Sequence, residues 1–241
     1  MGNEKNAKIK EYLACERWGV YILLMVVGGF YGAFTYNIRG GVFCNAQTGN
    51  FVLAAIALGN MQWSKALYYV IPITAYFAGA FLSETLGLSI KRFHLIRWDT
   101  LLVLFEIVAV IVLAFLPENA PYQITQVTFN FICSMQYNTF RQAQNVPMAT
   151  TFCTNHLRQA GIALTRALRH HDSSFIKRML CHFGMIGIFM IGAISATILC
   201  RFFRGKALLF TLIPLTIVAV DLLLADLTEE KDMLDRVPGG H

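Results

Sequence analysis

Residues 18–36 read WGVYILLMVVGGFYGAFTY and contain no charged residue. A helix needs about 20 apolar residues to cross a bilayer, so this stretch predicts a first transmembrane helix. The whole chain of 241 residues agrees, because 56% of it is apolar and only 14% is charged. A water-soluble domain carries charge on about a quarter of its residues. The composition therefore indicates an integral membrane protein and excludes a soluble enzyme built around one large core.

Further apolar stretches are long enough to cross the bilayer, and they are residues 66–90, 100–116, 121–140, 179–200 and 207–225. Two remaining stretches, 37–65 and 141–178, each hold a shorter helix-like piece. Six crossings with both termini inside would place 15 basic residues inside and 5 outside. The positive-inside rule favours this arrangement. We therefore predict an all-α membrane protein with six transmembrane helices, two re-entrant half-helices and both termini in the cytoplasm.

The two halves of the chain carry similar motifs in the same order. At shifts of 101, 106 and 113 positions, the matched pairs are Tyr36-Asn37 with Tyr137-Asn138, Thr48-Gly49-Asn50 with Thr154-Asn155-His156, and Gly79-Ala80 with Gly192-Ala193. Chance matches are the alternative, because small and apolar residues are common in this chain. The conserved order favours a duplication.

An odd number of crossings in each half would turn the second half upside down. We therefore expect two inverted three-helix repeats, 18–116 and 117–226, between a cytoplasmic segment 1–17 and a cytoplasmic tail 227–241. The acidic run at 229–232 is interpreted as a solvated end. Inverted repeats with interrupted helices place their binding site near the bilayer midplane, where the repeats meet.

The motifs of both halves resemble one known family. They read GGFYGAFTY at 28–36, RGGVF at 39–43, AQTGN at 46–50 and ATTFCT at 149–154. These residues resemble the YoaK family, a group of uncharacterised bacterial multi-pass membrane proteins with a domain of unknown function. The resemblance covers nearly the whole chain and implies a bacterial inner-membrane location. In the second copy the family usually shows Thr-Gly-Asn, whereas this chain has Thr154-Asn155-His156. Asn155 tolerates the left-handed conformation that glycine permits.

Two junctions between a loop and a short helix are candidate binding elements. In the first junction the candidate binding residues are Gln47, Thr48, Gly49 and Asn50, where Thr48 or Asn50 suits an N-cap and Gly49 permits unusual backbone angles. In the second junction they are Thr151, Thr154 and Arg158. A half-helix that starts inside the membrane directs free N–H groups and a positive dipole end inward, which suits an anion. Ordinary surface loops capped by threonine are the alternative.

The predicted fourth transmembrane helix carries a polar stripe. Its members are Gln123, Gln126, Asn130, Ser134 and Asn138. Their spacing of three and four places them on one helical face, which must turn toward protein or water. Interhelical hydrogen bonds would explain the stripe structurally. Five polar groups exceed one packing contact, so we expect a cavity wall in which Asn130 and Ser134 bind solute.

Ionisable residues inside the predicted transmembrane helices are functional candidates, because burying them costs several kcal/mol. They are Glu84, Glu106, His182 and Asp221. Glu106 lies nearest the middle of its helix and is the proton-coupling candidate, with a neutral, hydrogen-bonded carboxylic acid as the alternative. The other three lie near helix ends, where they can reach water.

Together these features predict a permease for a small polar or anionic solute that binds near the midplane between the half-helix N-termini. The alternative is a membrane scaffold or sensor without transport. Enzyme activity is not expected, since HExxH and GxSxG motifs are absent from the sequence. The six cysteines lack metal-site spacing, so neither a metal nor a cofactor is expected. The lipid bilayer and the solute are the expected partners; nucleic acid is not, and a homo-oligomer stays open.

Overall fold

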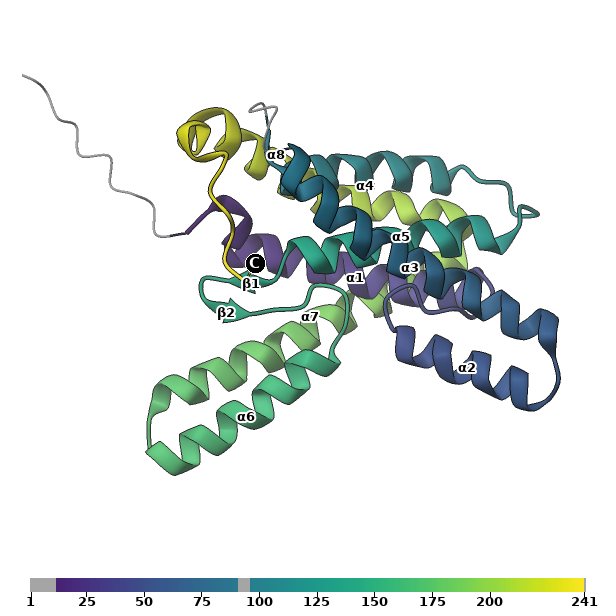
Figure 1. The fold of residues 1–241 in the computed structure, drawn as a ribbon, viewed down its shortest axis with the longest axis horizontal. Helices are drawn as coiled ribbons and strands as arrows, with labels where there is room; N and C mark the ends of the chain where they lie inside the picture. The colour runs from purple at the N-terminus through teal and green to yellow at the C-terminus, as the bar shows by residue number, and fades with distance from the viewer. Residues whose placement is uncertain (1–11, 91–95, 241) are drawn as a thin grey trace, which may run out of the picture.

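The computed structural model describes residues 12–90 and 96–240, and it is predominantly helical (Figure 1). The α-helices of this part are α1 (Trp18–Ile38), α2 (Gln47–Gly59), α3 (Trp63–Ile90), α4 (Trp98–Ala114), α5 (Tyr122–Thr139), α6 (Thr154–His170), α7 (Ser173–Phe203) and α8 (Leu212–Leu224). A two-stranded antiparallel hairpin joins β1 (Gln142–Ala143) to β2 (Val146–Pro147). Short helical turns are η1 (Ala14–Glu16), η3 (Arg204–Thr211), η4 (Ala225–Glu229) and η5 (Lys231–Met233).

Three helical segments of the described chain are long and apolar enough to cross a membrane. They are α1, the Trp63–Leu86 part of α3, and the continuous segment Ser173–Glu229 that contains α7 and α8. Helix α4 has 17 residues and α5 carries the polar stripe, so neither is among these segments. The fold is thus helical with membrane-spanning capacity, and six crossings remain a prediction.

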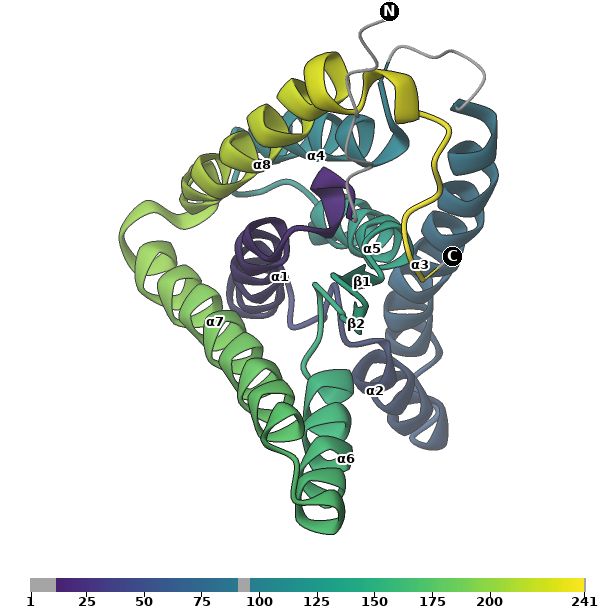
Figure 2. The same cartoon turned by 90° about the vertical axis from the view of Figure 1, so that its left-hand side faces the viewer.

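The long helices pack in crossed pairs. Helix α1 makes its most extensive contacts with α7, α5 makes its most extensive contacts with α3, and α4 packs against α8. Figure 2 shows α1 between α7 and α5. Helices α1 and α7 run in the same direction. Gly29 lies against Phe189 near the middle of both helices, and Asn37 bonds Thr197 nearer the C-terminal end of both.

Glycines permit the closest helix approaches. A Cβ atom added at Gly192 of α7 would collide with the carbonyl oxygen of Val26 on α1, and one added at Gly79 of α3 would collide with the carbonyl oxygen of Phe131 on α5. Small residues let helix backbones meet in this way inside membranes. Both glycines belong to the small-residue motifs matched between the halves of the sequence.

The two short helices each fold back on the helix that follows, so α2 pairs with α3 and α6 pairs with α7 (Figure 1). The expected capping was wrong. Helix α2 begins at Gln47 with Ala46 as its N-cap, and Thr48 and Asn50 lie inside the first turn. The Asn50 amide cannot cap the helix because it bonds the backbone of the preceding loop.

The backbone angles of the junctions also differ from the prediction. Gly49 is helical, as is Asn155, and neither has a positive φ. The left-handed glycines near the first junction are Gly40 and Gly41, with φ of 83° and 69°, and they turn the chain directly after α1. The turn that the sequence motif predicted therefore lies several residues before α2.

The N-terminal segment and the C-terminal tail pack together at one end of the molecule. Arg17 forms ion pairs with Asp221 at 2.5 Å and with Glu229 at 2.9 Å. Glu230 is fully buried and accepts a hydrogen bond from the Ala14 N–H at 2.7 Å. The interpretation of the acidic run at 229–232 as a solvated end was therefore wrong for Glu230, because this carboxylate caps the chain entering η1.

Candidate functional site

The loops that precede the two short helices meet at Gly28, in the middle of α1. The Asn45 side chain, from the loop before α2, donates a hydrogen bond to the Gly28 carbonyl oxygen at 2.9 Å. The loop before α6 brings the Thr150 carbonyl oxygen so close to Gly28 that a Cβ atom would not fit. Since Gly28 has no side chain, both irregular loops can approach the same turn of α1.

Side-chain amides connect the start of α2 to the polar stripe on α5. Gln47 Nε2 donates to Asn130 Oδ1 at 2.6 Å, and Asn50 Nδ2 donates to Gln47 Oε1 at 3.1 Å. Asn50 also accepts a bond from the Phe43 N–H at 3.2 Å and donates to the Phe43 carbonyl at 2.7 Å. Three residues predicted for the site are thus brought together: Gln47, Asn50 and Asn130.

The same stripe continues toward the end of α1. Gln126 Nε2 donates to the Arg39 carbonyl oxygen at 2.6 Å and bonds the Tyr68 hydroxyl of α3. Asn130 Nδ2 donates to the Gln126 carbonyl oxygen at 2.7 Å. The stripe therefore supplies interhelical hydrogen bonds to α1, α2 and α3, as well as facing the centre of the bundle.

At the start of α6 a histidine takes the position that an asparagine holds in α2. His156 Nε2 lies 2.7 Å from the Ala149 carbonyl oxygen, seven residues earlier, and Asn50 bonds Phe43 across the same interval. The other nitrogen, His156 Nδ1, lies 3.1 Å from Nδ1 of His182 on α7. Both imidazoles are fully buried. The expectation that His182 reaches water was wrong, because α6 covers it.

Several polar atoms in this region are buried and have no hydrogen-bond partner among the described residues. They are Gln126 Oε1, Ser134 Oγ, Thr150 Oγ1, Thr151 Oγ1 and His182 Nε2. An unpartnered buried polar group costs about 1–3 kcal/mol. Buried polar atoms on α5, α7 and the second loop therefore distinguish these elements from an ordinary apolar helix interface.

Glu106, on α4, lies beside Tyr31 of α1. Its carboxyl group is fully buried, and the Tyr31 hydroxyl of α1 is close enough to interact with it. It makes no hydrogen bond to the amides around Gln47. The remaining ionisable candidates are paired: Glu84 with Arg141 at 3.0 Å and Asp221 with Arg17.

Other predicted binding residues lie away from the buried group. Thr48, Thr154 and Arg158 are exposed, and Gly49 is half-buried against Phe43. Arg158 donates to Asn155 at 3.1 Å, which belongs to its own helical turn. In the first turns of α2 and α6, only the side with Asn50 or His156 is therefore buried in the bundle.

Sequence reasoning did not select Asn45, Gln126 or His156 as site residues. Asn45 directly precedes the first junction motif, His156 belongs to the second, and Gln126 belongs to the polar stripe, so their positions in the sequence could have identified them. Their partners were not visible in the sequence. Among the residues that the structure describes, His, Cys, Asp and Glu side chains form no group of three or more that could hold a metal ion.

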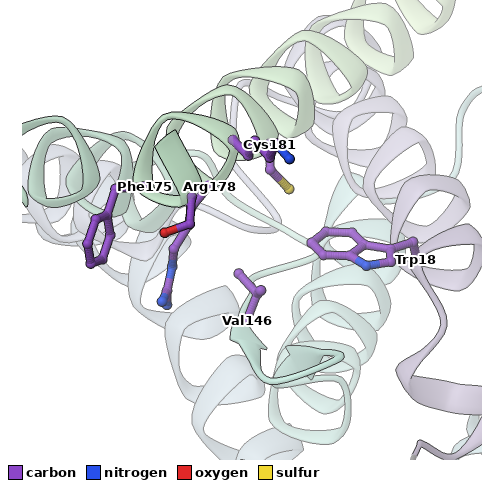
Figure 3. Close-up of a pocket in the computed structure, with 7 residues that line it drawn as sticks. Trp18, Val146, Phe175, Arg178 and Cys181 are labelled. Carbon is purple, nitrogen blue, oxygen red and sulfur yellow. The ribbon is translucent and has the colours of Figure 1, made fainter. Parts of the chain in front are cut away.

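A separate pocket of about 380 Å³ opens between the first turns of α7, the β1–β2 loop and the start of α1 (Figure 3). Its walls include Trp18, Val146, Phe175, Arg178 and Cys181. Its lining on α7 runs from Ser174 to Cys181, the residue before His182.

Comparison with known proteins places the chain in a family without assigning an activity. No curated protein and no solved structure matches it. The family described as "Protein of unknown function (DUF1275)" matches residues 20–220, which include all the α-helices described above except the first residues of α1 and the last residues of α8. Because this match covers most of the sequence, the chain belongs to the DUF1275 family.

Proposed function

We propose that this protein is a membrane permease for a small polar or anionic solute. The solute would bind between the first turns of α2 and α6, beside Gly28 and the polar stripe of α5. The observation that carries the proposal is the meeting of two irregular loops at the middle of α1. Irregular backbone at membrane depth is tolerated only where it is buried in protein or lines water.

The packing supports an inverted repeat. If the first half maps onto the second at the shifts found in the sequence, each contact between halves should recur with its partners exchanged. One such pair of contacts is Asn138–Glu84 with Asn37–Thr197, at shifts of 101 and 113. The glycine crossings also correspond helix for helix, because Gly79 of α3 meets α5 and Gly192 of α7 meets α1. This exchange is what a two-fold relation between the halves requires.

An inverted repeat makes α2 and α6 enter the bilayer from opposite faces, with their N-termini near the midplane. Ala14 and Arg17, just before α1, pack against Glu229 and Glu230, just after α8, and this agrees with an even number of crossings such as six. We place that side in the cytoplasm on the positive-inside count. Movement of one repeat against the other would then expose the site alternately.

Two parts of the proposal concern charge. The anion preference rests on the inward N–H groups of α2 and α6, because Arg158 points away from the site. Proton coupling is proposed for Glu106, a carboxylate fully buried in a predicted transmembrane helix.

The test is permeation into liposomes that contain the purified protein, with glycerol as a neutral probe and potassium acetate and lactate as anionic probes. We expect permeation of at least one probe above that of empty liposomes. Asn130→Leu should reduce it about tenfold or more, since it removes the acceptor of Gln47 and leaves buried amides unpaired. Thr48→Ala, an exposed change in the same α2 junction, is the matched control and should retain the rate.

The alternative is a scaffold or sensor without transport, and one observation favours it: Cys44, beside the junction, is fully buried against Cys133. Liposomes that pass none of the probes faster than empty ones would support this alternative. Equal permeation rates for the Asn130→Leu and Thr48→Ala proteins would show that the solute does not bind at the proposed site, although the protein still transports it.

A further inference from the structure

The pocket at the start of α7 combines an apolar wall with positive charge. Trp18, Val146 and Phe175 supply apolar surface, while Arg178 supplies positive charge (Figure 3). Lys177 also lines the pocket and adds a second positive charge. No carboxylate lines it. Neither Lys177 nor Arg178 forms an ion pair with the residues that the structure describes.

The surrounding hairpin is also strongly basic. Residues 154–182 contain five arginine or lysine residues and a single acidic one, Asp172. The Asp172 carboxylate accepts a hydrogen bond from the Ser174 N–H at 2.8 Å, so it caps α7 and is not paired with the cations of the pocket. The positive charge of the pocket is therefore not compensated within this hairpin.

Helix α6 exposes both apolar and basic side chains. Its alanines pack against α7, while three leucines are exposed: Leu157 at 60%, Leu164 at 44% and Leu168 at 69%. The exposed arginines of the same helix are Arg158, Arg166 and Arg169. The outer side of α6 is therefore both apolar and basic, and its arginines lie outside the pocket.

We propose that this pocket binds the phosphate headgroup of an anionic phospholipid. Lys177 and Arg178 would hold the phosphate, because a guanidinium and an ammonium are the side chains that bind phosphate oxygens. Trp18 would lie at headgroup level, where tryptophans concentrate in membrane proteins. The exposed Ile176 and Leu180, which flank Lys177 and Arg178 in the sequence, would contact the acyl chains. This site is distinct from the solute site and does not depend on transport.

The experiment measures lipid binding to the full-length protein in detergent. Phosphatidylglycerol is titrated and its effect on the thermal unfolding temperature is compared with that of phosphatidylcholine and of soluble glycerol 3-phosphate. We expect phosphatidylglycerol alone to raise the unfolding temperature. An equal rise with phosphatidylcholine would overturn the proposal, and an equal rise with glycerol 3-phosphate would show that the pocket takes a free phosphate ester instead.

Matched double variants separate the pocket from general surface charge. Lys177→Gln/Arg178→Gln should weaken phosphatidylglycerol binding at least about tenfold, since each basic residue near an anionic surface contributes about 1 kcal/mol. Arg166→Gln/Arg169→Gln removes the same charge from α6 outside the pocket and should keep most of the affinity. Equal losses in the two variants would mean diffuse attraction and would contradict a built site.

A second readout reports on the pocket itself and does not need the charge variants to fold. The chain has three tryptophans, so Trp63→Phe/Trp98→Phe leaves Trp18 as the only one. Brominated phosphatidylglycerol should quench Trp18 fluorescence more strongly than brominated phosphatidylcholine at the same mole fraction. Equal quenching by both lipids would count against a headgroup-specific site.

Discussion

His156 and His182 share a hydrogen bond between their Nδ1 atoms, which lie 3.1 Å apart, and a nearby carbonyl determines which ring donates. The Ala149 carbonyl oxygen can only accept, so His156 carries its proton on Nε2. A neutral His156 then accepts through Nδ1 from the Nδ1–H of His182. His182 Nε2 is left with a lone pair and has no partner among the described residues.

This arrangement predicts a graded response to substitution at position 156. His156→Asn can keep the bond to Ala149, as Asn50 does with Phe43, and loses only the bond to His182. His156→Leu loses both bonds and leaves two buried polar groups unpaired, which costs about 2–5 kcal/mol. We expect the asparagine variant to lose about half as much stability as the leucine variant in thermal or denaturant unfolding. Equal losses would mean that the Ala149 bond contributes nothing.

The glycine crossing between α1 and α7 predicts a position-specific packing defect. Gly192→Ala places a methyl group against the Val26 carbonyl, and the backbones must separate, at a cost of about 1–3 kcal/mol. Gly187→Ala, on the same helix, meets no atom within 4 Å and should be neutral or slightly stabilising. Unfolding temperatures of the two variants in detergent provide the comparison. A neutral Gly192→Ala would show that the helices do not approach as closely as described.

Cysteine labelling tests the burial of the two junctions. Cys44 is fully buried beside Cys133, with their sulfurs 3.7 Å apart, whereas Cys153 is half-buried at the N-cap of α6. We keep one cysteine at a time, change the others to serine, and apply a membrane-impermeant thiol reagent to folded protein in sealed vesicles of both orientations. Cys153 should react much faster than Cys44, and from the cytoplasmic side. Fast reaction of Cys44 would mean that the first junction opens to water.

The connection between α6 and α7 predicts a pH effect on stability. The Ser174 N–H donates to the Asp172 carboxylate and lowers the pKa of that carboxyl below its ordinary value. A lowered folded-state pKa gives stability that is present above the unfolded-state pKa and is lost as pH falls through the folded-state pKa. Wild type and Asp172→Ala should therefore differ in unfolding temperature at neutral pH and converge in acid. Ser173→Ala is the control, and a difference that persists in acid would rule out the capping carboxylate as its cause.

The positions of the long helices were predictable from the sequence, because long apolar helices correspond to long uncharged stretches. The predicted first crossing, 18–36, lies within α1, and the predicted fifth, 179–200, lies within α7. Short pieces expected in the two remaining stretches are α2 and α6. The structure extends α7 by six residues at its start, because Asp172 caps it and α6 packs beside its first turns.

The candidate site was predictable only in part. The polar spacing on α5 identified one face of that helix, but it could not identify Gln47 as the partner of Asn130. The threonine motif located the junctions, yet Thr48 and Thr154 face outward while Asn50 and His156 face inward. Two positions along a helix are enough to move a side chain from the exposed to the buried face. Which face is buried depends on how the helix packs against its neighbours.

The sequence by itself determined that the chain is apolar, helical and punctuated by two junction motifs, because these properties depend on composition and local periodicity. Only the tertiary structure decided that both junctions meet at Gly28, that Gly79 and Gly192 mark helix crossings, and that His156 pairs with His182. The reason is physical: hydrogen bonds and close backbone contacts depend on distances between segments far apart in the chain, and these distances follow from how the helices cross.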